Sequence, residues 1–183
     1  MCFGYPHEIR TAALPTRMKV KLQPATVEDA EAVAALRNAV SDDLTFKHGK
    51  GWWTHHCTTA GVLFDLRNAK LYVALHRDEV VASLALNTKK PWAIDLKHFS
   101  KVARPFYLTA MVVAPELQRQ GHGRACLAEV MKISRRAKAG AIFLDAYDHP
   151  AAGAGPFYAK CGWRECGRAT YRGVPLNYYE LLV

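Results

Sequence analysis

Apolar residues in the first part of the chain recur at helical spacing. Thr26 and Asp29 resemble a capping box, in which the side chains at a helix N-terminus bond back to its free amides. The apolar positions that follow fit one face of an amphipathic helix: Ala30, Val33, Leu36 and Val40. We expect a strand at about residues 18–22 before this helix, and a second helix with a wide apolar face within residues 47–68, broken around Gly61.

From residue 71 the period changes to two, which is typical of strands. Residues 71–75 and 80–86 alternate around the polar pair Arg77–Asp78 and predict an antiparallel hairpin. Residues 106–113 form a continuous apolar run that ends before Pro115. Such a run predicts a central strand buried on both faces.

The second half of the chain alternates between the two patterns. We expect a helix over residues 123–139 that stops at Gly140, a strand over 141–147, a short helix over 155–160 closed by Gly162, and two closing strands at about 163–171 and 177–183. Strands in a mixed sheet with helices covering it define an α+β fold, or α/β in the loose sense. We expect one domain over residues 18–183 after an irregular arm at 1–17.

The composition supports a folded chain without a membrane segment. Of 183 residues, 50% are hydrophobic and 22% are charged, as in ordinary globular proteins. No apolar run approaches the roughly 20 residues that span a bilayer, and no export signal is evident. The five cysteines include no CxxC pair, so neither a disulfide framework nor a structural zinc site is indicated, and we expect a cytoplasmic protein.

The net charge of +9 favours a polyanionic partner without choosing one. Lysines and arginines are scattered along the chain, whereas nucleic-acid-binding segments usually gather them. A phosphate-bearing cofactor therefore fits better than nucleic acid.

The segment 113–124 carries the clearest chemical signal. Its two glycines lie between the strand and the helix, where free N–H groups and the helix dipole favour an anion. The Walker A motif is excluded, because neither glycine precedes Lys-Ser or Lys-Thr. A Rossmann fingerprint remains a minor rival: Gly121, Gly123 and Asp145 imitate its spacing, but Cys126 stands at the third glycine position.

This segment most resembles the GNAT superfamily of N-acetyltransferases. That family has a strand ending in V-x-P followed by [QR]-x-x-G-x-[GA], which here reads Val113-x-Pro115, then Gln118-x-x-Gly121-x-Gly123. The later stretch Phe-Tyr-Ala-Lys-Cys-Gly-Trp, residues 157–163, resembles the family's FYxKxGF segment. The order of elements also agrees, and it implies a mixed, mostly antiparallel, twisted sheet with flanking helices.

The resemblance implies a cofactor and its contacts. Family members bind acetyl-CoA as co-substrate, without a metal ion, and the strand before the loop separates from its neighbour to pair with pantetheine. By position, the pantetheine contacts are Met111, Val112 and Val113, and the phosphate contacts are Gln118, Arg119, Gln120, Gly121, His122, Gly123 and Arg124.

The resemblance also implies a reaction, the direct transfer of acetyl to a primary amine of a small molecule or peptide. Tyr158 corresponds to the family's usual general acid, since a phenol can return a proton to the departing thiolate. Where the family often has an asparagine before the Phe-Tyr pair, this chain has residues 148–153, and the family's base has no clear counterpart. The open candidates for the base are Glu116, Tyr107, Asp95, His98 and His149.

Several alternatives stay open at this stage. Trp52 and Trp53 fit either the core or an aromatic wall for the acceptor, and Cys126 and Cys161 are read as buried hydrophobes before nucleophiles. The stretch 55–57, His-His-Cys, lacks visible partners for a metal site. A rival function is a basic module that senses CoA, or that binds or acylates RNA. Neither the acceptor nor the oligomeric state, a homodimer included, can be read from the sequence.

Overall fold

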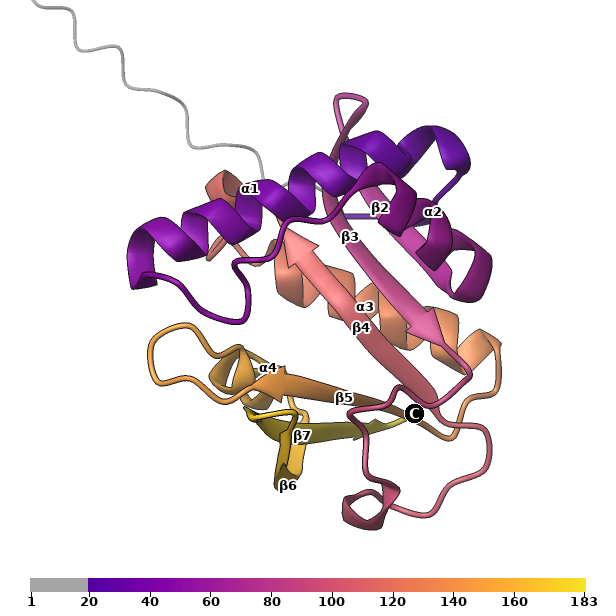
Figure 1. Cartoon of the computed structure of the whole chain (residues 1–183). Coiled ribbons are helices and arrows are strands. Elements are labelled where there is room, and N and C mark those ends of the chain that lie inside the picture. The colour runs from indigo at the N-terminus through magenta and orange to yellow at the C-terminus, as the bar shows by residue number, and fades with distance from the viewer. Residues whose placement is uncertain (1–19) are drawn as a thin grey trace, which may run out of the picture.

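A single seven-stranded sheet organises the protein in a computed structural model that describes residues 20–183 (Figure 1). Its strand order is β1-β2-β3-β4-β5-β7-β6, and only β4 and β5 are parallel neighbours. The strands are β1 (Leu22–Pro24), β2 (Lys70–His76), β3 (Glu79–Asn87), β4 (Phe106–Val113), β5 (Ala141–Tyr147), β6 (Arg164–Tyr171) and β7 (Val174–Leu182). The helices are α1 (Ala30–His48), α2 (Thr59–Asn68), α3 (His122–Arg136) and α4 (Gly155–Lys160). This mixed, mostly antiparallel sheet with flanking helices is the α+β fold predicted above.

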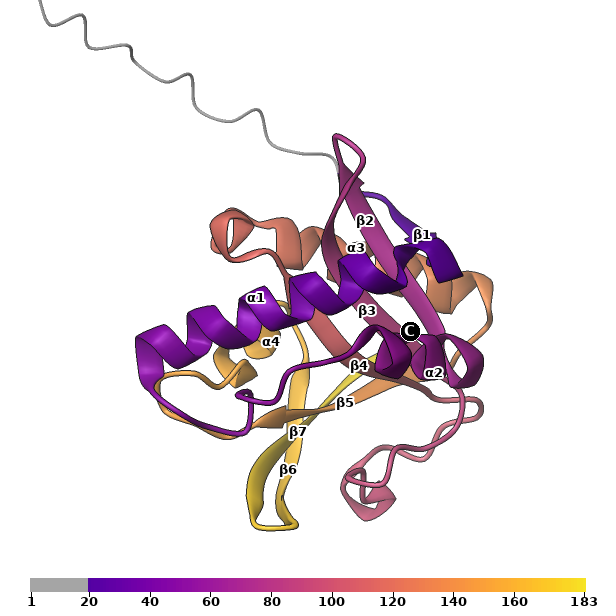
Figure 2. The same ribbon diagram turned by 45° about the horizontal axis from the view of Figure 1, so that its top comes forward.

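The helices lie on opposite faces of the sheet. α1 and α2 cover one face, where Val33 and Val62 pack against Leu71 and Val73, and α3 lies behind the sheet in Figure 1. Figure 2 shows α1 crossing the strands obliquely. On the α3 face, apolar positions of that helix bury against β3 and β5 in the largest cluster of the core, which also contains Tyr158. Helices therefore cover both faces of the middle of the sheet.

Several predicted elements have the predicted bounds. The strands Phe106–Val113 and Ala141–Tyr147 and the helix Gly155–Lys160 coincide with the expected ranges. The β2–β3 hairpin turns at Arg77 and Asp78, both at positive φ (50° and 66°), as a two-residue turn that follows the twist of the strands requires. These elements carry strong local signals, so the sequence alone defines them.

The structure corrects the prediction for the first strand. We expected it at about residues 18–22, but β1 is Leu22–Pro24 and pairs with Tyr72–Ala74 of β2. Pro24 can belong to a strand here because β1 is at the edge of the sheet, where a missing N–H costs no ladder bond. The predicted arm at residues 1–17 lies outside the described residues.

Two predicted helix boundaries are also wrong. Gly61 does not break a helix: it lies in the first turn of α2, where its N–H donates to Thr58 Oγ1 at 3.1 Å, and the irregular segment is residues 49–58. α3 ends at Arg136, before Gly140, because Lys138 takes a positive φ of 55° and the Ala139 N–H bonds back to Ser134 O at 3.0 Å. None of the helices within residues 20–183 is long and apolar enough to cross a membrane.

A buried carboxylate ties β7 to the connection between β3 and β4. The side chain of Glu180 is only 1% exposed, and its oxygens accept from Ser100 N (2.8 Å), from Ser100 Oγ (2.7 Å) and from both Nε (3.1 Å) and Nη2 of Arg164. Burial alone would raise the pKa of Glu180, but the hydrogen bonds from Ser100 and Arg164 and the charge of Arg164 outweigh it and lower the pKa. The ionised form is therefore the one that the fold stabilises.

Replacing this carboxylate, Glu180→Gln, is expected to cost about 2 kcal/mol of unfolding free energy, because charge-assisted hydrogen bonds are lost in a buried site. Since the folded-state pKa is lowered, the advantage of the wild type is complete above the unfolded-state pKa of about 4.3. It disappears as the pH falls through the lower folded-state pKa. Urea unfolding of both proteins at several pH values measures this difference. Glu79→Gln, which alters an exposed carboxylate, is the control; equal stabilities of wild type and Glu180→Gln at pH 7 would contradict the assignment.

Candidate active site

β4 and β5 separate soon after they meet. Their parallel pairing consists of Phe106 with Ile142 and Tyr107 with Phe143, whereas β4 stays paired with β3 as far as Val113. The separation is visible as the opening between the two strands in Figure 1. The prediction that β4 is buried on both faces therefore holds only for its first half, and beyond Leu108 its residues are partly or fully exposed.

The free edge of β4 presents main-chain groups to this opening. The Ala114 N–H donates to Val81 O of β3 at 2.9 Å, and in an antiparallel pair alternate residues direct their polar groups to opposite sides. Val112 therefore faces β3, opposite Ser83, while Met111 and Val113 direct their N–H and C=O groups away from β3. Ala110, at a positive φ of 50°, marks an irregularity of the strand at the start of this segment.

The loop after β4 brings the N-terminus of α3 to the end of the opening. Arg119 (φ 58°) and Gly121 (φ 88°) both have left-handed backbones, which reverse the chain just before the helix begins at His122. The first amide bonded inside the helix is that of Ala125, which donates to Gly121 O at 3.0 Å. The amides of the three residues before it have no acceptor inside the helix, so this end can hold an anion.

The polar side chains of the loop mostly brace the loop itself. Gln118 Nε2 donates to Val113 O at 3.0 Å, and Gln120 Nε2 donates to Glu116 O at 2.6 Å. His122 is buried, and Arg124 Nη2 donates to Lys160 O of α4 at 2.9 Å. In this arrangement the free main-chain amides, more than the glutamine side chains, are available to a ligand.

A pocket of about 520 Å³ lies between the end of α1, the loop, α3 and α4. Most of the predicted site residues line it, and Gln120 and His122 do not. The predicted residues in its wall are Met111, Val112, Val113, Gln118, Arg119, Gly121, Gly123, Arg124 and Tyr158. Positions far apart in the sequence thus converge on one cavity.

Gly123 and Phe157 join the two sequence motifs physically. A Cβ atom at Gly123 would lie 3.1 and 3.3 Å from two ring atoms of Phe157, closer than side chains normally pack. A larger residue at this position would force the Phe157 ring to shift by a few tenths of an ångström, so glycine suits this close approach of α3 to α4. Together with the bond from Arg124 to Lys160 O, this contact makes the loop and α4 one unit.

Tyr158 is the ionisable residue that the sequence placed at the centre of the chemistry. Its side chain lines the pocket, although the whole residue is only 8% exposed, and its ring packs against Trp163 and Tyr179 at centroid distances of 5.6 and 5.9 Å. Burial, followed by the charges of Asp145 and Cys161, raises the pKa of the phenol well above its usual value. Tyr158 therefore stays protonated at neutral pH, as a proton donor must.

The structure adds walls that the sequence did not reveal. The C-terminal half of α1 contributes Val40, Lys47 and His48, and the β5–α4 loop contributes residues 151–154. No local pattern marked the end of α1, because its part in the pocket arises only from tertiary packing. For residues 148–153 the sequence contains one indication of a different site, because this stretch lacks the asparagine that the family often has before the Phe-Tyr pair.

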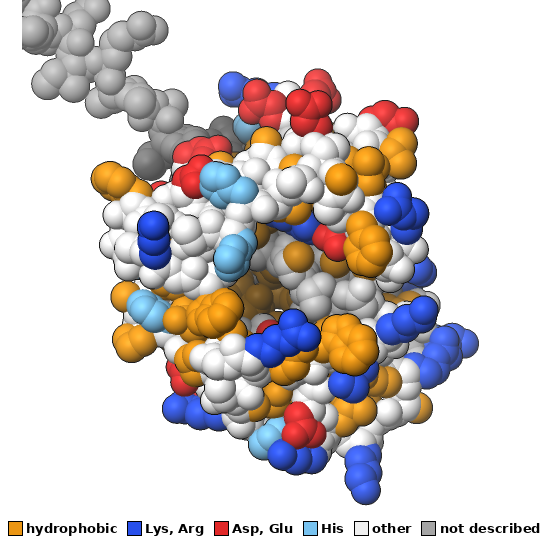
Figure 3. All heavy atoms as spheres, viewed as in Figure 1, with side chains coloured by type: hydrophobic (Ala, Val, Ile, Leu, Met, Phe, Trp, Pro, Cys, Tyr) orange, Lys and Arg blue, Asp and Glu red, His pale blue; other side chains and the backbone are white. Residues whose placement is uncertain are grey.

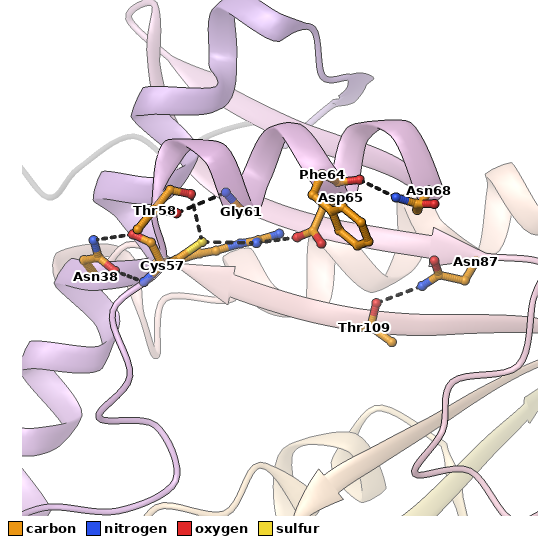
Figure 4. Close-up of polar contacts among 10 residues, drawn as sticks. Asn38, Cys57, Thr58, Gly61, Phe64, Asp65, Asn68, Asn87 and Thr109 are labelled. Atoms are coloured by element: carbon orange, nitrogen blue, oxygen red, sulfur yellow. Dashed lines mark hydrogen bonds and ion pairs between the residues drawn. The ribbon is translucent and has the colours of Figure 1, made fainter.

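The segment between α1 and α2 is fixed over the sheet face that bears these helices. Asn38 forms two bonds with the main chain of Cys57, donating to its O at 3.0 Å and accepting from its N–H at 2.7 Å (Figure 4). Arg37 Nη1 of α1 pairs with the Asp65 carboxylate of α2 at 2.7 Å. Earlier in this segment the Trp53 ring packs against the rings of Tyr147 and His149, at centroid distances of 5.7 and 5.4 Å.

This packing partly buries Trp53, while Trp52 is half exposed, and neither lines the pocket, so the aromatic wall for the acceptor stays a prediction. Figure 3 shows the face hollowed between the helical part and the β5–β7 part, with hydrophobic, acidic, basic and histidine side chains around the hollow.

Four of the five base candidates from the sequence have other partners, and the fifth, Glu116, is exposed. Tyr107 is buried against Phe143, and Asp95 accepts from Lys97 N at 3.2 Å. The His98 ring packs on Tyr178, and His149 Nδ1 accepts from the Ala152 N–H at 3.1 Å. Within residues 20–183, no group of three or more His, Cys, Asp or Glu side chains could hold a metal ion.

The comparison with known proteins gives a family match. The model of the family described as "Acetyltransferase (GNAT) family" matches residues 33–163, which include both motifs and the pocket. A search of the curated proteins found no match.

Solved structures share the fold at low sequence identity. A ribosomal-protein-alanine N-acetyltransferase from Brucella melitensis has a TM-score of 0.66 at 20% identity, covering 89% of this chain and 99% of that one. The PaiA N-acetyltransferase from Thermoplasma acidophilum, solved with coenzyme A, has a TM-score of 0.65 at 14% identity, covering 90% and 100%. An acetyltransferase from Thermus thermophilus has a TM-score of 0.64 at 18% identity, covering 91% and 99%. Because the family model matches most of the chain, the protein belongs to the GNAT family of acetyltransferases.

Proposed function

We propose that this protein is an acetyl-CoA-dependent N-acetyltransferase that transfers the acetyl group directly to a primary amine. The observation that carries this proposal is the convergence of three features on one pocket: the free edge of β4, the N-terminus of α3 and Tyr158. The relative from Thermoplasma acidophilum was solved with coenzyme A, which supports the choice of ligand.

The residues present fit this ligand. The pyrophosphate is assigned to the first amides of α3, where the helix dipole adds about half a positive charge, and Arg119 and Arg124 lie in the same wall. Pantetheine, an amide-containing chain, is assigned to the outward main-chain groups of Met111 and to the N–H of Val113, because the Val113 O already accepts from Gln118. The bound thioester supplies an activated acetyl group, so the protein has to orient it and manage protons.

The proposed chemistry needs little from the protein beyond polar groups in fixed positions. A main-chain N–H on the open edge of β4 near Val113 can donate to the oxygen that becomes negative in the transition state. Tyr158 can then give its proton to the departing sulfur, because the burial that raises the pKa of this phenol also keeps it protonated. No metal ion is required for either step.

The acceptor is proposed only as a class, a primary amine on a small molecule or peptide. The Brucella melitensis relative is named for ribosomal-protein alanine, but the 20% identity shows only a shared fold. The family match supports an enzyme and gives no support to the alternative of a CoA-sensing or RNA-binding module. A panel of amines assayed by thiol release would identify the acceptor.

Coenzyme A should stabilise the protein against heat. At 100 times its dissociation constant, a ligand that binds only the folded state adds about 2.7 kcal/mol. For a chain of this size that corresponds to a rise in Tm of about 5–10 °C. The matched control ligand is an acetyl thioester of N-acetylcysteamine, which lacks the diphosphate and should leave Tm unchanged. Equal shifts with both ligands would remove the α3 amides from the site.

Substitution Tyr158→Phe should lower kcat by about 100-fold, because the leaving sulfur loses its proton donor. The phenylalanine ring preserves the packing against Trp163 and Tyr179, so the affinity for coenzyme A and the Tm should change little. Thiol release and calorimetric titration measure the two effects. Tyr171→Phe, at the end of β6, is the control and should behave as wild type; unchanged turnover in Tyr158→Phe would exclude the phenol from the mechanism.

A further inference from the structure

The loop between β5 and α4 forms part of the pocket wall and has no side chain that could anchor it from within. Residues 151–154 line the cavity, and residues 151–155 read Ala-Ala-Gly-Ala-Gly. Methyl groups and hydrogens make neither hydrogen bonds nor ion pairs. Because a loose wall would have to be ordered each time a ligand binds, the affinity of the pocket depends on what holds this loop.

Each hydrogen bond that the amides of residues 151–153 donate goes to His149. The Ala152 and Ala151 amides donate to its Nδ1 at 3.1 and 3.3 Å, and the Gly153 amide donates to its main-chain O at 2.8 Å. A Cβ atom at Gly153 would lie 2.6 Å from this same oxygen and 2.7 Å from Tyr147 O, so no side chain fits there. The loop is therefore wound tightly around one histidine.

These bonds define the form of the imidazole. An N–H group donates only to a ring nitrogen that carries no hydrogen, so the neutral ring of His149 has its hydrogen on Nε2. Neither ring nitrogen is then available to take a proton from a substrate, since Nε2 already carries one and Nδ1 is bonded to two amides. The geometry favours a different role for this candidate base.

Aromatic packing determines where this imidazole lies. The His149 ring is stacked on Tyr147 at an interplanar angle of 25°, and the Trp53 ring meets it edge to face at 83°, both with centroids 5.4 Å apart. The indole N–H of Trp53 is buried and has no hydrogen-bond partner in the described part of the chain, so packing orients this ring. His149 thus has a defined position from which it holds the loop.

Trp53 also connects the loop to α1. Its main-chain O accepts from Ser41 Oγ in the middle of that helix, and its ring centroid lies 6.4 Å from that of His48 at the helix end. His48 lines the pocket, as the loop does. Figures 1 and 2 both show the segment between α1 and α2 beside the β5–α4 loop. Two walls of the pocket are therefore linked through Trp53 and His149.

We infer that His149 is a positioning residue for the cofactor, an inference that rests on the proposed function. Its Nδ1 holds the β5–α4 loop in the shape that coenzyme A meets, while Trp53 and Tyr147 hold the imidazole. The proton donor Tyr158 does not depend on this loop alone, because the contacts between α3 and α4 already fasten its helix. Loosening the loop should therefore weaken the affinity for coenzyme A and leave the proton donor in place.

Two substitutions separate the acceptor atom from the ring. His149→Asn removes the ring but keeps an acceptor, since an asparagine oxygen bonds the amide two residues ahead in an Asx turn. His149→Phe keeps a ring and has no acceptor. The dissociation constant for coenzyme A, measured by calorimetric titration, should rise about 10-fold in His149→Phe and stay within about 2-fold of wild type in His149→Asn. His76→Phe, which alters an exposed histidine at the end of β2, is the control and should bind as wild type.

Turnover distinguishes positioning from proton transfer. With saturating acetyl-CoA, kcat should fall less than about 2-fold in both His149 variants, whereas KM for acetyl-CoA should follow the dissociation constants. An affinity in His149→Asn as weak as that of His149→Phe, or weaker, would mean that ring packing is what matters and would overturn the proposal. Unchanged affinity in both variants, or a large loss of kcat, would overturn it as well.

A further measurement needs neither ligand nor turnover. Nitrogen NMR shifts of the His149 ring should place its hydrogen on Nε2, and the Ala151 and Ala152 amides should exchange with solvent about 10-fold more slowly in wild type and His149→Asn than in His149→Phe. Hydrogen on Nδ1, or equal exchange in all three proteins, would show that His149 does not hold the loop. Failure of the proposed function would look different: the wild type would bind no coenzyme A although the exchange pattern was as expected.

Discussion

The early end of the β4–β5 pairing is the constraint on which the rest of the site depends. Two adjacent parallel strands normally bond along their length, and a break leaves main-chain groups that need other partners. Here β4 keeps its bonds to β3, so it remains part of the sheet while its other edge opens. The opening can persist because β5 is held independently by β7 along all of its residues. The protein therefore has a rigid gap in the middle of its sheet, and a ligand can complete it.

The loop and the short helix that flank this gap are built as one piece. The absence of a side chain at Gly123 lets Phe157 approach the first turn of α3, and Arg124 bonds to the last residue of α4. The proposed anion site and the proposed proton donor Tyr158 cannot easily move apart, because the two helices that carry them share this contact. Such coupling fixes the distance between the ends of a long ligand, which is how binding energy far from the reacting atoms is used to orient them.

The parts that could be predicted from the sequence are those with local signals. The strand 106–113, the short helix 155–160 and the Arg77–Asp78 turn are defined by apolar runs, glycine and turn residues, and the structure has them at the same positions. The wall formed by Val40, Lys47 and His48 could not be predicted, since nothing nearby in the sequence records that α1 ends beside the pocket. The hydrogen-bond partners of Gln118 and Gln120 could not be predicted either, because an amide side chain can bond a ligand or the main chain with similar energy.

Two carboxylates on neighbouring strands show how hydrogen-bond partners decide the ionisation of a buried acid. Glu180 on β7 accepts four hydrogen bonds from Ser100 and Arg164, which outweigh its burial and lower its pKa. Asp145 on β5 has no such donors, and burial raises its pKa. Burial acts on both carboxylates in the same direction, so the hydrogen-bond donors that neighbouring segments supply decide the direction in which each pKa moves.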